Sequence, residues 1–80
     1  MALRFIGIDP NTGHNECPTV WYDDDREEFV FQGRKAGEEL LEKCLETGSI
    51  PDTEAVVRLP ARMAQMIKEA VDAAERAPLR

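Results

Sequence analysis

Four side chains of the types that bind metals or act as nucleophiles occur at spacings that suggest a shared site. His14 and Cys17 are three positions apart, and Asp9 or Cys44 would complete a set of ligands around one ion. Structural zinc sites usually combine two closely spaced ligand pairs, such as C-x2-C with H-x3-H, whereas this chain has one pair. The alternative interpretation is a loop histidine beside a thiol, with no metal bound.

A cysteine–histidine catalytic pair is the other chemistry that these side chains suggest. Such a pair needs the thiolate within hydrogen-bond reach of the imidazole, and a third group that orients the imidazole. Cys17 is followed directly by Pro18 at the start of a predicted strand, so no helix N-terminus is available to stabilise a thiolate. The sequence also has no obvious set of oxyanion donors. We therefore expect no enzymatic activity and no cofactor.

Acidic residues are concentrated in one short stretch of the chain. Asp23, Asp24, Asp25, Glu27 and Glu28 lie within six positions. They lack the alternating D-x-D-x-D-G spacing and the distal glutamate of a calcium-binding loop. The stretch is typical of a solvated hairpin turn that discourages edge-to-edge aggregation. The functional alternative is an electrostatic docking patch for a basic partner.

Size and charge exclude several classes of function. The chain has 80 residues and a formal net charge of −6, and residues 1–40 alone carry nine acids and four bases. Nucleic-acid binding needs a Lys/Arg surface that neutralises phosphates, so we expect no direct contact with nucleic acid. No apolar run is long enough to cross a membrane, and no signal peptide opens the chain. Together with only two cysteines, these features predict a cytoplasmic protein.

The hydrophobic pattern predicts a single small α+β domain over residues 1–80, with a small antiparallel sheet packed against two helices. Runs of β-branched and aromatic residues predict the strands, and stripes at helical spacing predict the helices. The predicted strands are a hairpin over 19–22 and 28–32, with short strands near 3–8 and 55–59. The predicted helices cover about 36–46 and 60–77.

The register of the hairpin decides the role of its aromatic residues. Phe29 and Phe31 share one face of their strand, which we expect to pack on the helices while the other face is half covered. Trp21 either joins that core or lies on the outer face beside Val30, where it would be a protein-binding anchor. The candidate partner-binding residues are Trp21, Tyr22, Asp23, Asp24, Asp25 and Glu27.

Two short motifs stand in the predicted hairpin: C-P-T-V-W at 17–21 and F-V-F-Q-G at 29–33. They resemble the C-P-[ST]-[LV]-[YW] and [YF]-V-x-Q-G strands of a family of small actinobacterial proteins of the Streptomyces type. The stretches 5–12 and 56–63 also resemble this family, so the resemblance covers most of the chain. Arg34 departs from it, since an aromatic residue often follows the Q-G pair. Members are often encoded near helix-turn-helix regulators, which implies a regulatory accessory role but supplies no catalytic or binding residue.

Two functional hypotheses follow from these observations. The first is a non-enzymatic protein-interaction module accessory to a transcription regulator. Its partner would be a helix-turn-helix regulator or a second copy of the chain, because so small a domain gains buried area by association. The second is a small metal- or redox-responsive protein that uses His14, Cys17 and Cys44.

Overall fold

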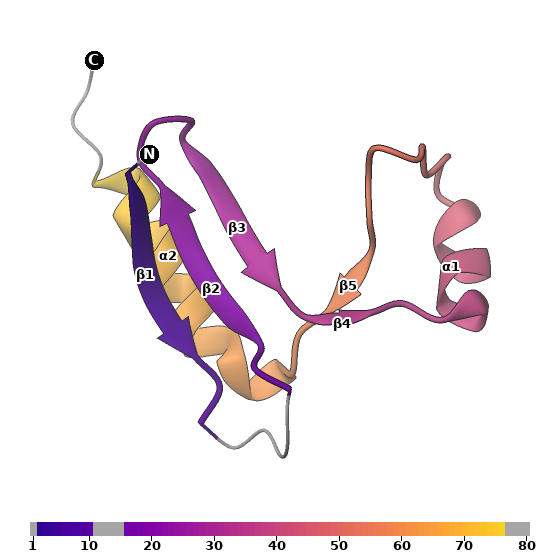
Figure 1. The fold of residues 1–80 in the computed structure, drawn as a ribbon, viewed down its shortest axis with the longest axis horizontal. Coiled ribbons are helices and arrows are strands. Elements are labelled where there is room, and N and C mark those ends of the chain that lie inside the picture. The colour runs from indigo at the N-terminus through magenta and orange to yellow at the C-terminus, as the bar shows by residue number, and fades with distance from the viewer. Residues whose placement is uncertain (1, 11–15, 77–80) are drawn as a thin grey trace.

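The described strands form a three-stranded antiparallel sheet and a short two-stranded ribbon (Figure 1). This computed structural model describes residues 2–10 and 16–76. The sheet has the order β1-β2-β3, and the ribbon pairs β4 with β5. The predicted α+β class, the hairpin and the N-terminal strand are confirmed. The strands are β1 (Leu3–Ile8), β2 (Thr19–Asp23), β3 (Glu28–Gln32), β4 (Arg34–Lys35) and β5 (Val57–Arg58).

The register of the sheet separates the aromatic residues of the hairpin onto two faces. Trp21 lies opposite Phe5 on one side and Val30 on the other, while the next residue, Tyr22, lies opposite Phe29. Cross-strand partners share a face, and neighbours along a strand alternate between faces. Trp21 is therefore on the opposite face from Tyr22, and it does not join the phenylalanines.

The C-terminal helix covers the face that carries Tyr22 (Figure 1). A short 3-10 helix, η1 (Ala61–Met63), leads into α2 (Ala64–Glu75) at the position where Pro60 favours helix entry. α2 packs on β1 and β2, and a bulge in β1 turns Gly7 toward it. A Cβ atom at Gly7 would lie 2.8 Å from the sulfur of Met66, so the missing side chain lets the helix approach the sheet. The buried hydrophobic residues of this core are Val20, Tyr22, Met63, Ala70 and Ala73.

An ion pair between an exposed arginine and a buried carboxylate ties the end of β1 to η1. Asp9 is 5% exposed, and Arg62 holds its carboxylate in a bidentate arrangement, with Nε donating at 3.0 and 3.1 Å and one terminal nitrogen at 2.7 Å. These hydrogen bonds, and the negative charge of Asp9, raise the pKa of Arg62. The pair thereby fixes the start of the helical segment against the sheet.

Residues 34–58 form an arm that projects beyond β3 (Figure 1). The arm contains β4, the helix α1 (Glu38–Leu45) and β5. The predicted strand near 55–59 pairs with β4 rather than with the hairpin, and α1 buries none of its residues. The prediction that both helices pack on the sheet is thus correct for α2 only, because α1 lies between the paired strands β4 and β5, which carry it away from the sheet. The chain turns into the arm at Gly33, where a Cβ would lie 2.2 Å from the carbonyl oxygen of Arg58.

The arm gives the molecule an open shape. The Cα radius of gyration is 14.2 Å, whereas about 11.6 Å is expected for a globular chain of this length. The accessible surface is 6350 Å², against about 4,900 Å² for a typical folded monomer of this mass. Neither described helix has the length and apolar character that a membrane span requires. Because the arm projects away from the sheet, much apolar surface is left accessible to a partner.

Candidate protein-binding surface

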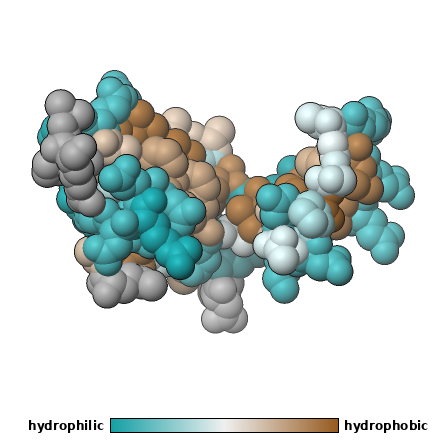
Figure 2. Space-filling view, turned by 90° about the horizontal axis from the view of Figure 1, so that it is seen from above, coloured by the Kyte–Doolittle hydropathy of each residue, from teal (hydrophilic) through white to brown (hydrophobic). Residues whose placement is uncertain are grey.

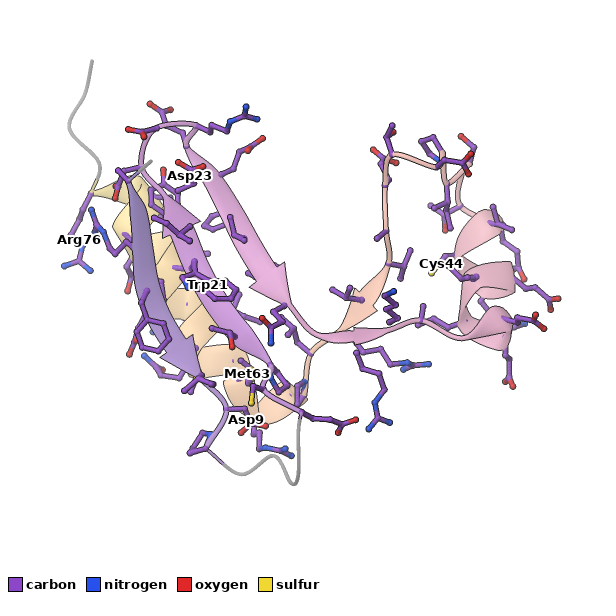
Figure 3. The ribbon with its side chains drawn as sticks, in the orientation of Figure 1. Asp9, Trp21, Asp23, Cys44, Met63 and Arg76 are labelled. Carbon is purple, nitrogen blue, oxygen red and sulfur yellow. The ribbon has the colours of Figure 1, made fainter. Side chains whose placement is uncertain are left out.

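The face of the sheet opposite α2 carries large apolar side chains that no described element covers (Figures 1 and 3). At its centre, Phe5, Trp21 and Val30 form a cross-strand row through all three strands. Phe5 is 59% exposed, and Trp21 and Val30 are half-buried. Leu3 and Ile8 lie on the same face at either end of β1. We call these five residues the outer face.

The chemistry of the outer face suits protein recognition. Single exposed apolar residues are common on protein surfaces, but a contiguous apolar row usually marks an interaction site. Aromatic side chains offer a large contact area with few rotatable bonds, and tryptophan is enriched among residues that dominate binding energies. Trp21 is the single tryptophan of the chain, and the row places it between Phe5 and Val30.

The acidic turn between β2 and β3 borders one end of the outer face (Figure 3). Asp23 is 5% exposed and shapes the turn, since its carboxylate accepts hydrogen bonds from the backbone N–H groups of Asp25 and Arg26 at 2.9 and 3.1 Å. Asp24 pairs with Arg4 at 2.9 Å, and Asp25 accepts a hydrogen bond from the backbone of residue 2. The acids therefore build the turn and hold the chain start, and they also place negative charge beside the outer face.

The predicted partner-binding residues fall into three groups. Trp21 lies on the outer face, whereas Tyr22 is 2% exposed and belongs to the core. Asp23 is buried in the turn, so it presents little surface to a partner. Asp24 and Asp25 lie in the turn, and Glu27 closes it with a φ of 57°. Of the predicted set, Trp21 and these turn acids remain candidates for contact.

Phe5 is the main contact candidate that the residue patterns missed. The apolar run at 3–8 indicated a strand whose large residues serve the core. In the structure Phe5 faces outward and Ile6 packs on the core. The sequence of β1 does not alternate strictly between apolar and polar residues, so only the pairing of Phe5 with Trp21 shows that Phe5 faces solvent.

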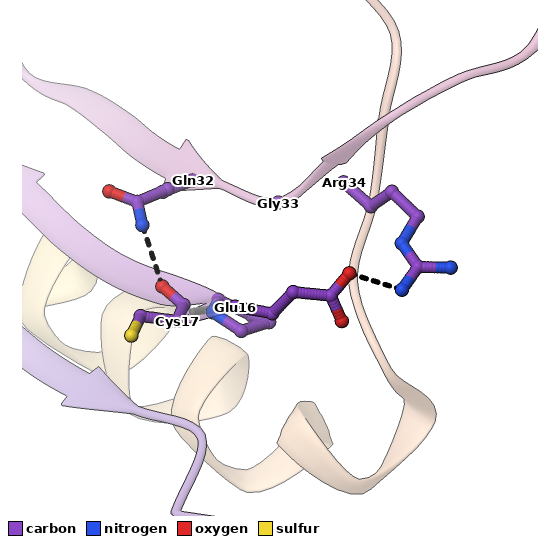
Figure 4. Close-up of a pocket in the computed structure, with 6 residues that line it drawn as sticks. Glu16, Cys17, Gln32, Gly33 and Arg34 are labelled. Atoms are coloured by element: carbon purple, nitrogen blue, oxygen red, sulfur yellow. Dashed lines mark hydrogen bonds and ion pairs between the residues drawn. The ribbon is translucent and has the colours of Figure 1, made fainter. Parts of the chain in front are cut away.

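A small cavity lies beside Cys17, between the start of β2 and the end of β3 (Figure 4). The side-chain amide of Gln32 donates a hydrogen bond of 2.8 Å to the carbonyl oxygen of Cys17, and Arg34 forms an ion pair with Glu16. The cavity volume is about 180 Å³. Ligand pockets usually measure about 300 Å³ or more, so the cavity fits a partner side chain better than a metabolite.

The two cysteines of the metal or redox hypothesis lie in different elements of the described chain. Cys17 is exposed at the start of β2, and Cys44 is half-buried in α1; both are free thiols. His14 is outside the described residues. Among residues 2–10 and 16–76, no group of three potential ligands is close enough to hold a metal ion. The hypothesis stays a prediction.

Comparison with protein-family models, curated proteins and solved structures finds no match to this chain.

Proposed function

We propose that this protein is a non-enzymatic interaction module, accessory to a transcription regulator, that binds its protein partner with the outer face of the sheet. The observation that carries the proposal is the row of Phe5, Trp21 and Val30, in which Phe5 is exposed and the other two side chains are half-buried. The chain has few large apolar residues, so three of them on one surface are a large part of the apolar area that the protein could bury.

The energetics of the outer face support binding. Burial of a Phe side chain contributes about 1.5–3 kcal/mol, and Phe5 is 59% exposed, so a partner gains about 1–2 kcal/mol from this side chain alone. Further burial of Trp21 and Leu3 adds to this amount. The row thus supplies an apolar centre of the kind found in protein–protein interfaces.

The acidic turn supports a basic partner. Opposite charges at the rim of an interface steer association and select the orientation of the partner. Proteins that bind DNA carry basic surfaces, and a regulator of this kind would complement the turn that holds Asp24 and Asp25. The resemblance to proteins encoded beside helix-turn-helix regulators supports the same partner class.

The test is affinity capture from lysate of the cells that encode the protein, at physiological salt. We expect the wild-type chain to recover a DNA-binding regulator, and Phe5→Asp to lose it because a charge then occupies the centre of the outer face. The matched control is Val71→Asp, at an exposed site on α2. Equal recovery with Phe5→Asp and wild type, or recovery of no protein, would contradict the proposal.

A further inference from the structure

We propose that the chain forms a two-fold symmetric dimer in which β3 pairs antiparallel with β3 of a second copy. β3 is an edge strand, and no strand of the described chain pairs with its outer side. An edge strand presents unpaired N–H and C=O groups, and β3 contains no proline or lysine to block pairing. Val30 belongs to both this edge and the outer face, but the dimer uses the backbone edge of β3, whereas the proposed partner contacts the side chains of the outer face, so the two can be tested separately.

The phenylalanines of β3 are exposed in the single chain. Phe29 and Phe31 are 46% and 41% exposed, and their rings stack with centroids 6.3 Å apart. They lie on the same face of the sheet as α2, but the helix packs on β1 and β2 and leaves β3 largely uncovered. The sequence-based prediction correctly placed the two phenylalanines on the face of the sheet that carries the helix. It was wrong that helices cover them. A second sheet beside β3 would bury both rings.

The geometry of a sheet restricts the register of such a dimer. Cross-strand partners must share a face, so each residue of β3 pairs with a residue an even number of positions away. One register overlaps all five residues: Val30 lies opposite Val30 of the second copy, and Phe29 lies opposite Phe31 of the second copy. The four phenylalanines then form one apolar cluster between the two α2 helices.

Charge along the chain is complementary in this antiparallel arrangement. The acidic turn and Glu28 precede the apolar part of β3, and the basic residues Arg34 and Lys35 follow it. Antiparallel pairing places the acidic end of each strand beside the basic end of the other. Glu28 then lies opposite Gln32 of the second copy, close to the point where Arg34 begins the arm, and it competes with Glu16 for the Arg34 guanidinium. The same segment of a second chain is thus complementary in charge to this edge.

The surface area of the single chain is consistent with a dimer. The excess over a typical monomer, about 1,400 Å², is similar to one subunit's share of an obligate homodimer interface. The arm lies beyond the free edge of β3, and Figure 2 shows the surface hollowed between sheet and arm, with hydrophobic side chains on both sides. α1 makes no substantial packing contact with the sheet, so the sheet leaves its apolar stripe uncovered.

The test is the oligomeric state by sedimentation equilibrium, with one charge reversed at a time. Glu28→Lys and Arg34→Glu each create two like-charge contacts across the dyad, and we expect each to weaken the dimer about tenfold or more. An equimolar mixture of the two variants should dimerise again, because each new charge then meets its opposite. The controls Glu69→Lys and Lys68→Glu make the same changes on exposed positions of α2.

A wild-type chain that is monomeric at millimolar concentration would overturn the inference. So would a dimer that neither reversal weakens, or one that both weaken and the mixture does not restore. Phe31→Ser provides a second test, since it should abolish the dimer while circular dichroism shows a folded chain. Phe5→Asp should leave the dimer intact, so failure of the dimer and failure of the proposed function give different results.

Discussion

The junction between the sheet and the arm depends on the absence of a side chain at Gly33. In Gly33→Ala, the new Cβ would lie 2.2 Å from the carbonyl oxygen of Arg58 and 3.1 Å from Cδ2 of Leu59. Ordinary contact begins at 3.4 Å, so the two backbone segments must separate by about 1.2 Å, the difference between these distances. Such a separation breaks the hydrogen bonds between β4 and β5, because it exceeds the range of hydrogen-bond geometry.

We expect Gly33→Ala to lower the free energy of unfolding by about 2–3 kcal/mol, toward the upper end of overpacking effects, because the obstacle is backbone. For a domain of this size, the melting temperature should fall by about 10–20 °C. Urea denaturation measures the first quantity and calorimetry the second. Amide hydrogen exchange should show loss of protection at β4 and β5 before the sheet loses it.

The matched control is Gly48→Ala, in the loop after α1. A Cβ at this position meets no atom within 4 Å, and the residue has no positive φ. Alanine should therefore leave stability unchanged or raise it by about 0.4–1 kcal/mol, since it restricts the unfolded chain. Equal stability of Gly33→Ala and wild type would refute the close approach between Gly33 and Arg58.

Three further predictions follow from single contacts. Asp23→Ala should lower the free energy of unfolding by about 1–3 kcal/mol, measured by urea denaturation, because two backbone N–H groups of the turn lose their acceptor; unchanged stability would contradict this role. Arg62→Lys should lower the melting temperature, measured by calorimetry, because an ammonium group cannot replace the bidentate contact with Asp9; a melting temperature equal to wild type would count against the contact. Phe5→Ser should lower stability by about 1 kcal/mol or less, since Phe5 is 59% exposed and only the contacts of its covered part are lost; a loss of several kcal/mol would place Phe5 in the core.

Local patterns in the sequence were sufficient for the elements that depend on neighbouring residues. The alternation and β-branched content at 19–22 and 28–32 predict the hairpin, which spans 19–23 and 28–32 in the structure. The 3.6-residue period after Pro60 predicts the C-terminal helix, and Met63 from that stripe is fully buried. In both cases the signal comes from spacing within one element.

Long-range placement could not be read from the same patterns. The short run near 55–59 has strand character, but its partner is β4, because the turn at Gly33 brings residues 34–35 beside 57–58. The apolar stripe on α1 indicated a helix that packs on the sheet. In the structure, this eight-residue helix is part of the arm and buries no residue. Neither outcome depends on residue type within the element, so propensity and periodicity could not distinguish them.

The candidate site was predictable in part for the same reason. The sequence identifies Trp21 as either a core residue or an anchor on the outer face, and leaves both open. The register Phe5–Trp21–Val30 resolves the choice, since it places the indole opposite the face that carries α2. Tyr22, the next residue along the strand, lies in the core because adjacent strand residues face opposite sides of the sheet.

The fluorescence of Trp21 tests the proposed function most directly, because it is the single tryptophan of the chain and lies on the outer face. The measurement is a titration of the wild-type chain with the captured regulator, with acrylamide as a quencher of exposed indole. We predict a saturable shift of the emission to shorter wavelength and a loss of acrylamide quenching, because the partner removes water from the outer face. A complex that forms while the emission and the quenching of Trp21 stay unchanged would contradict the account.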